Sequence, residues 1–455
     1  MSAYDATGED RPVRSEDELL DVFRAAEKPP SAFRIGAEAE KFGIHQATLA
    51  PLSYAGPFGV ERILRTLAAG PSGWQPETET EGGPIIALRR GAASITLEPG
   101  GQFELSGAPL ETVHEVAEEA RQHQRELASI SRELEILWLG VGFHPLARPS
   151  DLPWVPKQRY GIMKRYLPER GSGAHDMMRR TATVQVNLDF ENERAAMRRL
   201  VTCLRLAPLV NAMTANSPFI EGRQSGKRSL RGEVWLRMDP ERSGLVSRLW
   251  GLAEPRYRDY VEWALDAGMF LFKRGDRVIN NAGQPFREFL KHGFEGHRAS
   301  LADFKLHLNT LFPEIRLKNT LEVRPCDSLP LELSSAVPAL FVGLLYDDQA
   351  FEQAEALARS LELEAVQAAR LDLTAHGLRA NIGSTSAQQL AERLIEIALG
   401  GLSRRARTDA LGRDEGVHLQ PLAALVEKGR SPADALLEAV GPAPTTAQIA
   451  HACRW

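Results

Sequence analysis

Two glutamates flank a Pro-Gly-Gly break in the stretch ITLEPGGQFELSGAPL at residues 95–110. Glu98 lies just before the break and Glu104 shortly after it, each among apolar, strand-like residues. An ionised carboxylate buried in such surroundings costs several kcal/mol unless a cation pairs with it. Because glycines let the backbone turn sharply or approach a ligand closely, the two carboxylates can converge on one cation. A hairpin corner with solvent-exposed glutamates fits the same residues.

Three other strand-like segments also carry polar side chains on one face. Side chains alternate between the two faces of a strand, so residues two apart lie on the same side. The sets that share a face are Glu38 with Glu40, Gln185 with Asn187 and Asp189, and Glu322 with Arg324. Each segment by itself also fits a strand whose polar face lies in water, or, for the last pair, a salt bridge on the sheet surface.

Taken together, the four segments favour a site for a hard divalent cation. Carboxylate and amide oxygens are ligands of Mg²⁺, which proteins usually share with substrate phosphates. Arginines such as Arg231 and Arg324 can hold a carboxylate or a phosphate through two parallel hydrogen bonds. We therefore expect phosphate chemistry at a site built from separate strands.

Composition and charge argue against several other classes of protein. The 455 residues carry a net charge of −5 and no long basic run, so nucleic acid is not an expected partner. Three cysteines without a CxxC pair predict neither a disulfide framework nor structural zinc, and indicate a reducing, cytosolic compartment. No apolar run reaches about 18 residues, so we expect no membrane span. The acidic N-terminus resembles neither a signal nor a transit peptide.

Several short motifs are incomplete. The run GKRS at 226–229 resembles a phosphate-binding loop, but its hydroxyl residue comes one place late and position 221 is Glu. The run LGVG at 139–142 lacks the third glycine of a dinucleotide-binding turn. His144 and His175 fall in expected loops, and we interpret both as surface histidines.

Helix and strand patterns alternate along the chain without an internal repeat. After a short disordered lead, Ser15 and Glu18 predict a capping box at the start of a helix. Strands are expected at 33–44, 85–89, 93–97, 136–143, 181–190 and 320–324, with a hairpin at 269–279, and helices at 61–69, 111–134, 193–212, 257–266 and 301–311. Loops are expected at 71–84, 144–180 and 214–232. Strands dispersed among helices, followed by a nearly all-helical region after 333, predict an α+β or mixed α/β fold.

Long strings of this sequence resemble the plant-type glutamate–cysteine ligases, a family also found in many bacteria. They are GAEAEKFG at 36–43, ITLEPGGQFELSGAPLET at 95–112, LGVGFHPLARPSDLPWVPKQRYGIMKRYLP at 139–168, RTATVQVNLDF at 180–190, NSPFIEGRQSGKRSLRGEVW at 216–235, FPEIRLKNTLEVRPCD at 312–327 and VGLLYDD at 342–348. The resemblance covers roughly 33–348 closely and the rest loosely.

The resemblance implies an α+β fold of the glutamine-synthetase-like kind, in which a curved antiparallel sheet forms a funnel with helices outside it. It implies a single catalytic domain over 1–455, with an N-terminal lead and helix at 1–32, the sheet core at 33–348 and a helical region at 349–455. The implied activity joins the γ-carboxylate of L-glutamate to the amine of L-cysteine with ATP, through a γ-glutamyl phosphate. This is the first step of glutathione biosynthesis.

The resemblance also implies roles for individual residues. The implied ligands of two or three Mg²⁺ ions are Glu38, Glu40, Glu98, Glu104, Asn187 and Glu322, and the implied contacts to the nucleotide phosphates are Gln185, Asn187 and Glu322. Arg324 is similar to the arginine that meets the transferred phosphoryl group, and Arg231 to the one that holds the glutamate α-carboxylate. Trp235 and Tyr160 are expected as pocket walls. For the base that deprotonates the amine, Glu104 and a substrate phosphate oxygen both stay open.

Three other readings of the function stay open at this stage. A related ligase could join glutamate to another amine, a guanidino kinase could move a phosphoryl group on the same general fold, and a binding protein could keep the sheet without the chemistry. We further expect a bacterial, cytoplasmic protein that is a monomer or weak homodimer.

Overall fold

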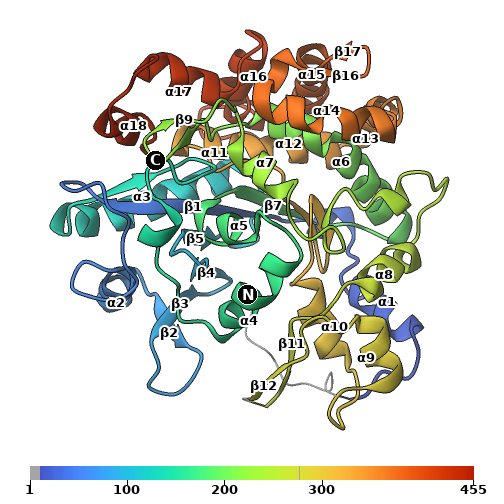
Figure 1. Ribbon diagram of the computed structural model, residues 1–455. Coiled ribbons are helices and arrows are strands. Elements are labelled where there is room, and N and C mark those ends of the chain that lie inside the picture. Colours follow the sequence, from blue (N-terminus) through green and yellow to red (C-terminus); the bar gives the residue numbers. More distant parts are fainter. Residues whose placement is uncertain (1–10, 276) are drawn as a thin grey trace.

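The computed structural model describes residues 11–275 and 277–455. One antiparallel sheet of nine strands runs through the molecule, in the order β14-β15-β7-β1-β5-β4-β3-β2, with β6 also paired to β1 (Figure 1). Its strands are β1 (Ile35–His45), β2 (Gln75–Thr78), β3 (Ile85–Arg90), β4 (Ala93–Leu97), β5 (Phe103–Ser106), β6 (Ile136–Leu139), β7 (Val184–Leu188), β14 (Ile315–Leu317) and β15 (Leu321–Val323). A mixed helix and antiparallel-sheet fold was predicted, and it is confirmed.

Helices and short two-stranded pairings make up the remaining regular structure. The helices are α1 (Asp17–Arg24), α2 (Val60–Ala69), α3 (Val113–Glu133), α4 (Gln158–Tyr166), α5 (Ala174–Arg180), α6 (Glu193–Met213), α7 (Leu230–Trp235), α8 (Tyr257–Asp266), α9 (Phe286–His292), α10 (Leu301–Leu308), α11 (Leu331–Ser334), α12 (Ala336–Leu345), α13 (Asp348–Arg359), α14 (Leu363–His376), α15 (Ala387–Arg405), α16 (Gln420–Val426), α17 (Pro432–Val440) and α18 (Thr446–Ala452). The short strands are β8 (Phe219–Ile220), β9 (Arg223–Gln224), β10 (Ser243–Gly244), β11 (Leu271–Arg274), β12 (Arg277–Asn280), β13 (Phe312–Pro313), β16 (Asn381–Ile382) and β17 (Thr385–Ser386).

The longest strand, β1, organises the sheet. Its first half pairs with β7 on one side and β5 on the other, and its last residues pair with β6. Each pairing is antiparallel, so the register sets directly opposite residues on the same face. Glu38 lies opposite Gln185, and Glu40 lies opposite Glu104. One strand therefore brings polar side chains from three parts of the chain together.

The opposite face of the sheet is apolar and packs into the main core. Val184, Val186 and Leu188 on β7 are buried in one cluster with residues of α6 and α12. These three residues alternate with Gln185 and Asn187, as the sequence predicts. The C-terminal helices α13, α14 and α15 extend this layer by packing against α6 or α12 (Figure 1).

Several predicted elements differ from the structure. The Ser15–Glu18 capping box is wrong, because α1 begins after Glu16 and Glu18 donates its backbone N–H to the Ser15 carbonyl instead. The expected loop at 144–180 contains α4 and α5, and the loop at 71–84 contains β2. The strand expected over 136–143 ends at Leu139. Residues 1–10, where the short N-terminal lead was predicted to begin, and residue 276 lie outside the described residues.

None of the described helices is both long enough and apolar enough to span a bilayer.

We predict that Leu188→Ala lowers the free energy of unfolding by about 2–5 kcal/mol, because it leaves a cavity behind β7. Leu188 is 1% exposed in the core. The matched control is Leu371→Ala, which truncates a leucine that is 56% exposed on α14 and should change stability by about 0.5 kcal/mol or less. Denaturant unfolding of both variants measures the difference, and equal losses would contradict the assigned core.

Candidate active site

The polar face of the sheet gathers the strand residues predicted to do chemistry. Across the strands from β14 to β4, the directly opposed residues are Arg316 with Glu322, Glu322 with Asn187, Gln185 with Glu38, Glu40 with Glu104, and Glu104 with Thr96. Alternation puts all of these on one side of the sheet. Glu98 immediately follows β4, so it lies at the end of the same face. The roles assigned to these residues stay predictions.

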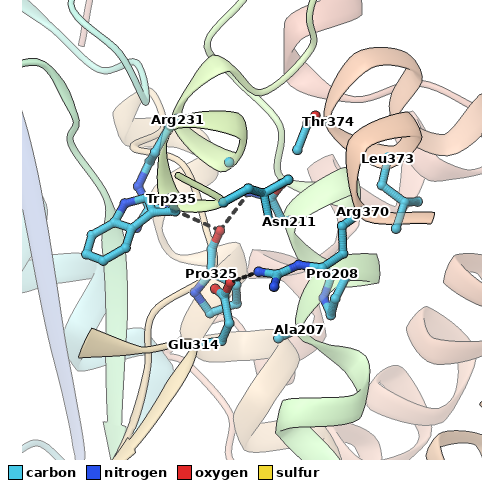
Figure 2. Close-up of a pocket in the computed structure, with 12 residues that line it drawn as sticks. Ala207, Pro208, Asn211, Arg231, Trp235, Glu314, Pro325, Arg370, Leu373 and Thr374 are labelled. Atoms are coloured by element: carbon cyan, nitrogen blue, oxygen red, sulfur yellow. Dashed lines mark hydrogen bonds and ion pairs between the residues drawn. The ribbon is translucent and has the colours of Figure 1, made fainter. Parts of the chain in front are cut away.

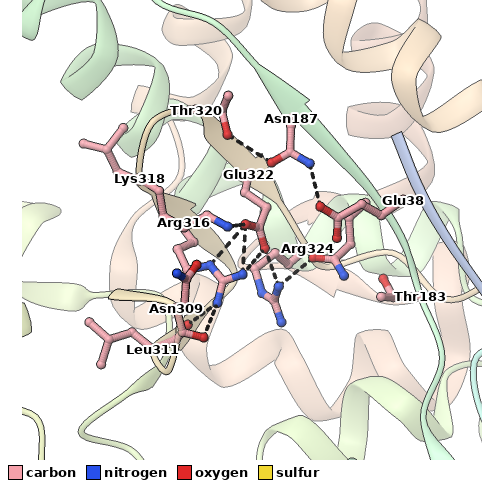
Figure 3. Close-up of polar contacts among 12 residues, drawn as sticks. Glu38, Thr183, Asn187, Asn309, Leu311, Arg316, Lys318, Thr320, Glu322 and Arg324 are labelled. Carbon is pink, nitrogen blue, oxygen red and sulfur yellow. Dashed lines mark hydrogen bonds and ion pairs between the residues drawn. The ribbon is translucent and has the colours of Figure 1, made fainter. Parts of the chain in front are cut away.

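One end of this face is cationic. The carboxylate of Glu322 is fully buried and accepts Arg316 at 2.6 Å, Lys318 at 2.5 Å and Arg324 at 2.5 Å. Burial alone would raise the pKa of Glu322, but the three neighbouring cations outweigh burial and hold that pKa well below its usual range. Glu322 is therefore ionised and fixes the position of three positive charges (Figure 3).

Asn187 joins the cationic end to β1. Its side-chain amide donates to the Glu38 carboxylate at 2.8 Å and accepts from the Thr320 hydroxyl at 3.0 Å. Arg324 donates to the side chain of Gln185 at 2.6 Å. The sequence did not single out Arg316 or Lys318, although the alternating cations of RLK at 316–318 were a usable signal.

The middle of the face is acidic. Burial, followed by the charges of Glu322 and Glu104, raises the pKa of Glu38 to about 7. Burial and the charges of Glu104 and Glu98 likewise raise the pKa of Glu40 well above its usual value. Carboxylates that repel one another in this way gain stability from a cation placed among them.

These donors fit a hard divalent cation by their chemistry. Glu38, Glu40, Glu104 and the neighbouring amides offer only oxygen ligands on the face that holds them, which is the set preferred by Mg²⁺. Within residues 11–275 and 277–455, no group of three or more histidine, cysteine, aspartate or glutamate side chains is arranged as a ready metal site. The structure therefore supports a set of oxygen donors on this face.

Glu98 and the Pro-Gly-Gly turn lie against α4 and α5. Lys157 and Tyr160 both donate to the backbone carbonyl of Leu97, at 2.8 Å and 2.7 Å. Arg159 approaches the Glu98 carboxylate at 3.9 Å. Tyr160 is thus a buried wall beside Glu98, whereas Lys157 and Arg159 are basic neighbours that the sequence interpretation did not name.

Arg231 and Trp235 lie one helical turn apart on α7 and line a small cavity between α6, α7 and α14 (Figure 2). Arg231 donates to the backbone carbonyls of Arg324 at 2.9 Å and Pro325 at 3.1 Å. The buried Nε of Arg231 and Nε1 of Trp235 have no hydrogen-bond partner among the described residues. Both are buried donors left unsatisfied on residues that line the cavity.

Two expectations about single residues are not met. His144 was interpreted as a surface histidine, but it is 1% exposed, and its Nδ1 accepts the backbone N–H of Ala147 at 3.0 Å. Asp189 does not join the polar face, because its carboxylate accepts the backbone N–H of Arg34 and pairs with Lys28 at 2.8 Å. Both side chains instead tie down backbone near the ends of strands.

The fold and the site together define a mixed helix and antiparallel-sheet protein with acidic and cationic groups side by side on one sheet face. Residues 34–454 match glutamate-cysteine ligase family 2 (GCS2), and the chain belongs to that family.

Named relatives agree with this family, and one solved structure has a similar fold. The chain is 37% identical over 437 residues to the chloroplastic glutamate–cysteine ligase of Medicago truncatula, which covers 95% of this chain and 83% of that protein. It is 37% identical over 430 residues to the chloroplastic enzyme of Arabidopsis thaliana, covering 94% of this chain and 80% of that protein. The glutamate–cysteine ligase of Francisella tularensis, solved in complex with AMP, has a similar fold, with a TM-score of 0.51 at 12% identity over 92% of this chain and 87% of that one.

The Pro-Gly-Gly turn generates a prediction, because Gly100 approaches the backbone of α5 closely. A Cβ at position 100 would lie 2.4 Å from the carbonyl oxygen of Arg179, a backbone atom that cannot rotate away. We expect Gly100→Ala to lower the free energy of unfolding by about 1–3 kcal/mol, the usual cost of overpacking.

The matched control is Gly161→Ala in α4, where a Cβ meets no atom within 4 Å. Alanine in an open helical position should be neutral or stabilising by up to about 1 kcal/mol. Thermal unfolding of the two variants compares them directly, and a Gly100→Ala variant as stable as Gly161→Ala would show that the turn is not held against α5.

Proposed function

We propose that this protein couples the γ-carboxylate of L-glutamate to the amine of L-cysteine with ATP, releasing ADP and phosphate and yielding γ-glutamylcysteine. This is the first step of glutathione biosynthesis. Membership of the glutamate–cysteine ligase family carries the proposal. The polar sheet face supports it, because acidic and cationic groups side by side suit a nucleotide polyphosphate with its divalent ion. Family membership favours this ligase over a guanidino kinase.

The reaction needs an activated carboxylate. A carboxylate does not acylate an amine directly, because oxide is a poor leaving group. In the proposed sequence a γ-carboxylate oxygen of glutamate attacks the terminal phosphorus of ATP, and ADP leaves. The amine then attacks the acyl carbon, phosphate leaves with its bonding electrons, and the amine proton passes to a base.

The chain's own side chains would orient and stabilise these steps. Arg324 would stabilise charge on the transferred phosphoryl group. Its Nη1 is held by Glu322 and Gln185, while its Nε and Nη2 have no hydrogen bond to described residues and could meet the phosphoryl oxygens. Arg231 and Trp235 offer unpartnered donors to glutamate. Tyr160 would close the site beside Glu98 and help to exclude water, which would otherwise hydrolyse the acyl phosphate.

The proposal includes Mg²⁺ held by Glu38, Glu40, Glu98, Glu104, Asn187 and Glu322, with Gln185, Asn187 and Glu322 also near the nucleotide phosphates. When bound, divalent ions neutralise charge that develops on the phosphates during transfer. The base remains either Glu104 or a phosphate oxygen. We also propose that the sheet belongs to the glutamine-synthetase-like funnel type, and that the chain forms one catalytic domain in the cytoplasm as a monomer or weak homodimer.

The decisive experiment incubates the protein with ATP, Mg²⁺, glutamate and cysteine, and identifies the product by mass spectrometry. We expect γ-glutamylcysteine and ADP in equal amounts. A panel of other amines in place of cysteine tests the acceptor. Release of ADP only with a different amine would reassign the acceptor, and a stable phosphorylated guanidine would overturn the ligase proposal.

Glu104→Gln, which keeps the side-chain shape but loses the charge, should reduce turnover at least about 100-fold.

Arg231 gives a prediction about substrate selectivity. If its free Nε holds the glutamate carboxylate, Arg231→Lys should raise the KM for glutamate about tenfold or more and the KM for ATP much less. Steady-state kinetics with each substrate varied measures both constants. An equal rise in the two values would instead mean that Arg231 acts through Arg324, whose backbone carbonyl it holds at 2.9 Å.

A further inference from the structure

The cationic end of the sheet face carries more positive than negative charge. Arg316, Lys318 and Arg324 all converge on the single carboxylate of Glu322 (Figure 3). Three cations around one anion leave two positive charges without a counter-charge inside the cluster. An anion from outside is the natural complement.

The three cations differ in the hydrogen-bonding capacity they have left. Arg316 donates Nε and Nη2 to Glu322, and Nη1 to the backbone carbonyls of Asn309 and Leu311. Its guanidinium is therefore fully used in holding Glu322 to the strand. The Lys318 ammonium has three donors, and among the described side chains Glu322 is its one direct partner. Lys318, like Arg324, retains donors for a ligand.

Lys318 also has the right location. It follows β14, and its backbone N–H closes the turn to β15 by donating to Thr320 at 3.0 Å. Its side chain folds back over the polar face to reach Glu322, and it lies near enough to Glu38 on β1 for the two charges to interact. The side chain is 19% exposed, so a ligand can reach it. The ammonium thus belongs to the cationic end and also interacts with Glu38 of the acidic middle.

We propose that Lys318 is a further phosphate-binding residue, whose ammonium contacts the terminal phosphates of the nucleotide beside Arg324. The assignment rests on the proposed function, since it takes the nucleotide as the substrate at this face. In the absence of nucleotide, Glu322 keeps Lys318 in place. When the polyphosphate is bound, Arg316 still holds Glu322, so the lysine can turn toward the phosphate without leaving a buried carboxylate unpaired.

A polyphosphate fits this position better than the glutamate carboxylate does. A phosphate group carries a charge of about −1.5 to −2 at neutral pH, which matches the two unbalanced positive charges, whereas a carboxylate supplies one. The acidic middle, beside Lys318, calls for a divalent cation, and a polyphosphate binds such a cation and side-chain cations together. The donors of Arg231 and Trp235 offer glutamate a separate place.

The experiment compares nucleotides of different phosphate length. Calorimetry measures the affinity of the full-length protein for the non-hydrolysable β,γ-imido analogue of ATP with Mg²⁺, for AMP, and for glutamate. Lys318→Met should weaken binding of the triphosphate analogue about tenfold or more, as expected for loss of a charge-assisted contact. Binding of AMP and of glutamate should stay within about twofold. Lys428→Met, which removes an exposed lysine on the helical side, is the matched control and should change none of the three.

A second measurement does not depend on any variant folding. Inorganic triphosphate with Mg²⁺ should protect Lys318 of the unaltered protein from an amine-reactive reagent, as read by peptide mass spectrometry, and AMP should not. Equal loss of AMP and triphosphate binding in Lys318→Met would assign the lysine a general structural role and overturn the proposal. Loss of glutamate binding alone would assign it to the amino acid, and unchanged affinities with no protection would leave it a solvated side chain; both overturn the proposal.

The outcome is separable from that of the proposed function. A protein that binds the triphosphate analogue through Lys318 but makes no γ-glutamylcysteine would contradict the proposed reaction and still support the phosphate contact. A protein that makes γ-glutamylcysteine with Lys318→Met binding the analogue normally would support the reaction and overturn the contact.

Discussion

The register of the central sheet forces like charges into contact, and the chemistry of the site follows from that constraint. Strand β1 sets Glu40 directly opposite Glu104, with Glu38 two residues away on the same face. Side chains opposed across an antiparallel pair lie roughly 5 Å apart at Cβ, so these carboxylates cannot all be ionised without positive charge nearby. Burial and this repulsion together raise the pKa values of Glu38 and Glu40. A cation placed among these carboxylates would relieve their repulsion, and the proposed divalent ion fits that place.

The apolar side of the sheet keeps the repelling carboxylates from moving apart. Val184, Val186 and Leu188 are locked into the core behind β7, and a slip of one residue would turn them outward and their polar neighbours inward. The carboxylates therefore cannot relax by shifting register. Packing on the apolar face therefore keeps the repelling carboxylates of the polar face close together. At the cationic end, Arg316 is fixed by hydrogen bonds to two backbone carbonyls.

The sequence was a good guide where side-chain alternation decides the outcome. The residues of 184–188 divide between the faces as their spacing predicts, and helix α8 occupies the expected residues, Tyr257–Asp266. Long strings that resemble a family gave the family itself, which the comparisons confirm. Local alternation does not predict which strands pair. Glu322 and Asn187 are 135 residues apart along the chain, and only the folded register sets them opposite each other.

Other features escaped because short local patterns do not carry them. Helix α4 contacts the end of β4 through the buried Tyr160 and lacks a clear apolar stripe, so the prolines and basic residues of 144–180 dominated the pattern. His144 was expected on the surface of a loop, yet it is buried. Its ring accepts a backbone N–H, and its ring centroid lies 4.9 Å from that of Phe42. Strand β14 has three residues, so the alternation in RLK at 316–318 was the one local signal for Arg316, and it is short.

The two ends of the polar face would couple the binding of the divalent cation and the polyphosphate proposed for them. A divalent cation that binds alone at Glu38 and Glu40 is attracted by the carboxylates but repelled by Lys318 and Arg324. A polyphosphate that binds alone is attracted by these two cations but repelled by the carboxylates. When both are present, each neutralises the charge that opposes the other, so each raises the affinity for its partner by the same factor. In the proposed function, the separation of charge along one sheet face would therefore favour the metal–nucleotide complex over either component, without requiring any movement of the strands.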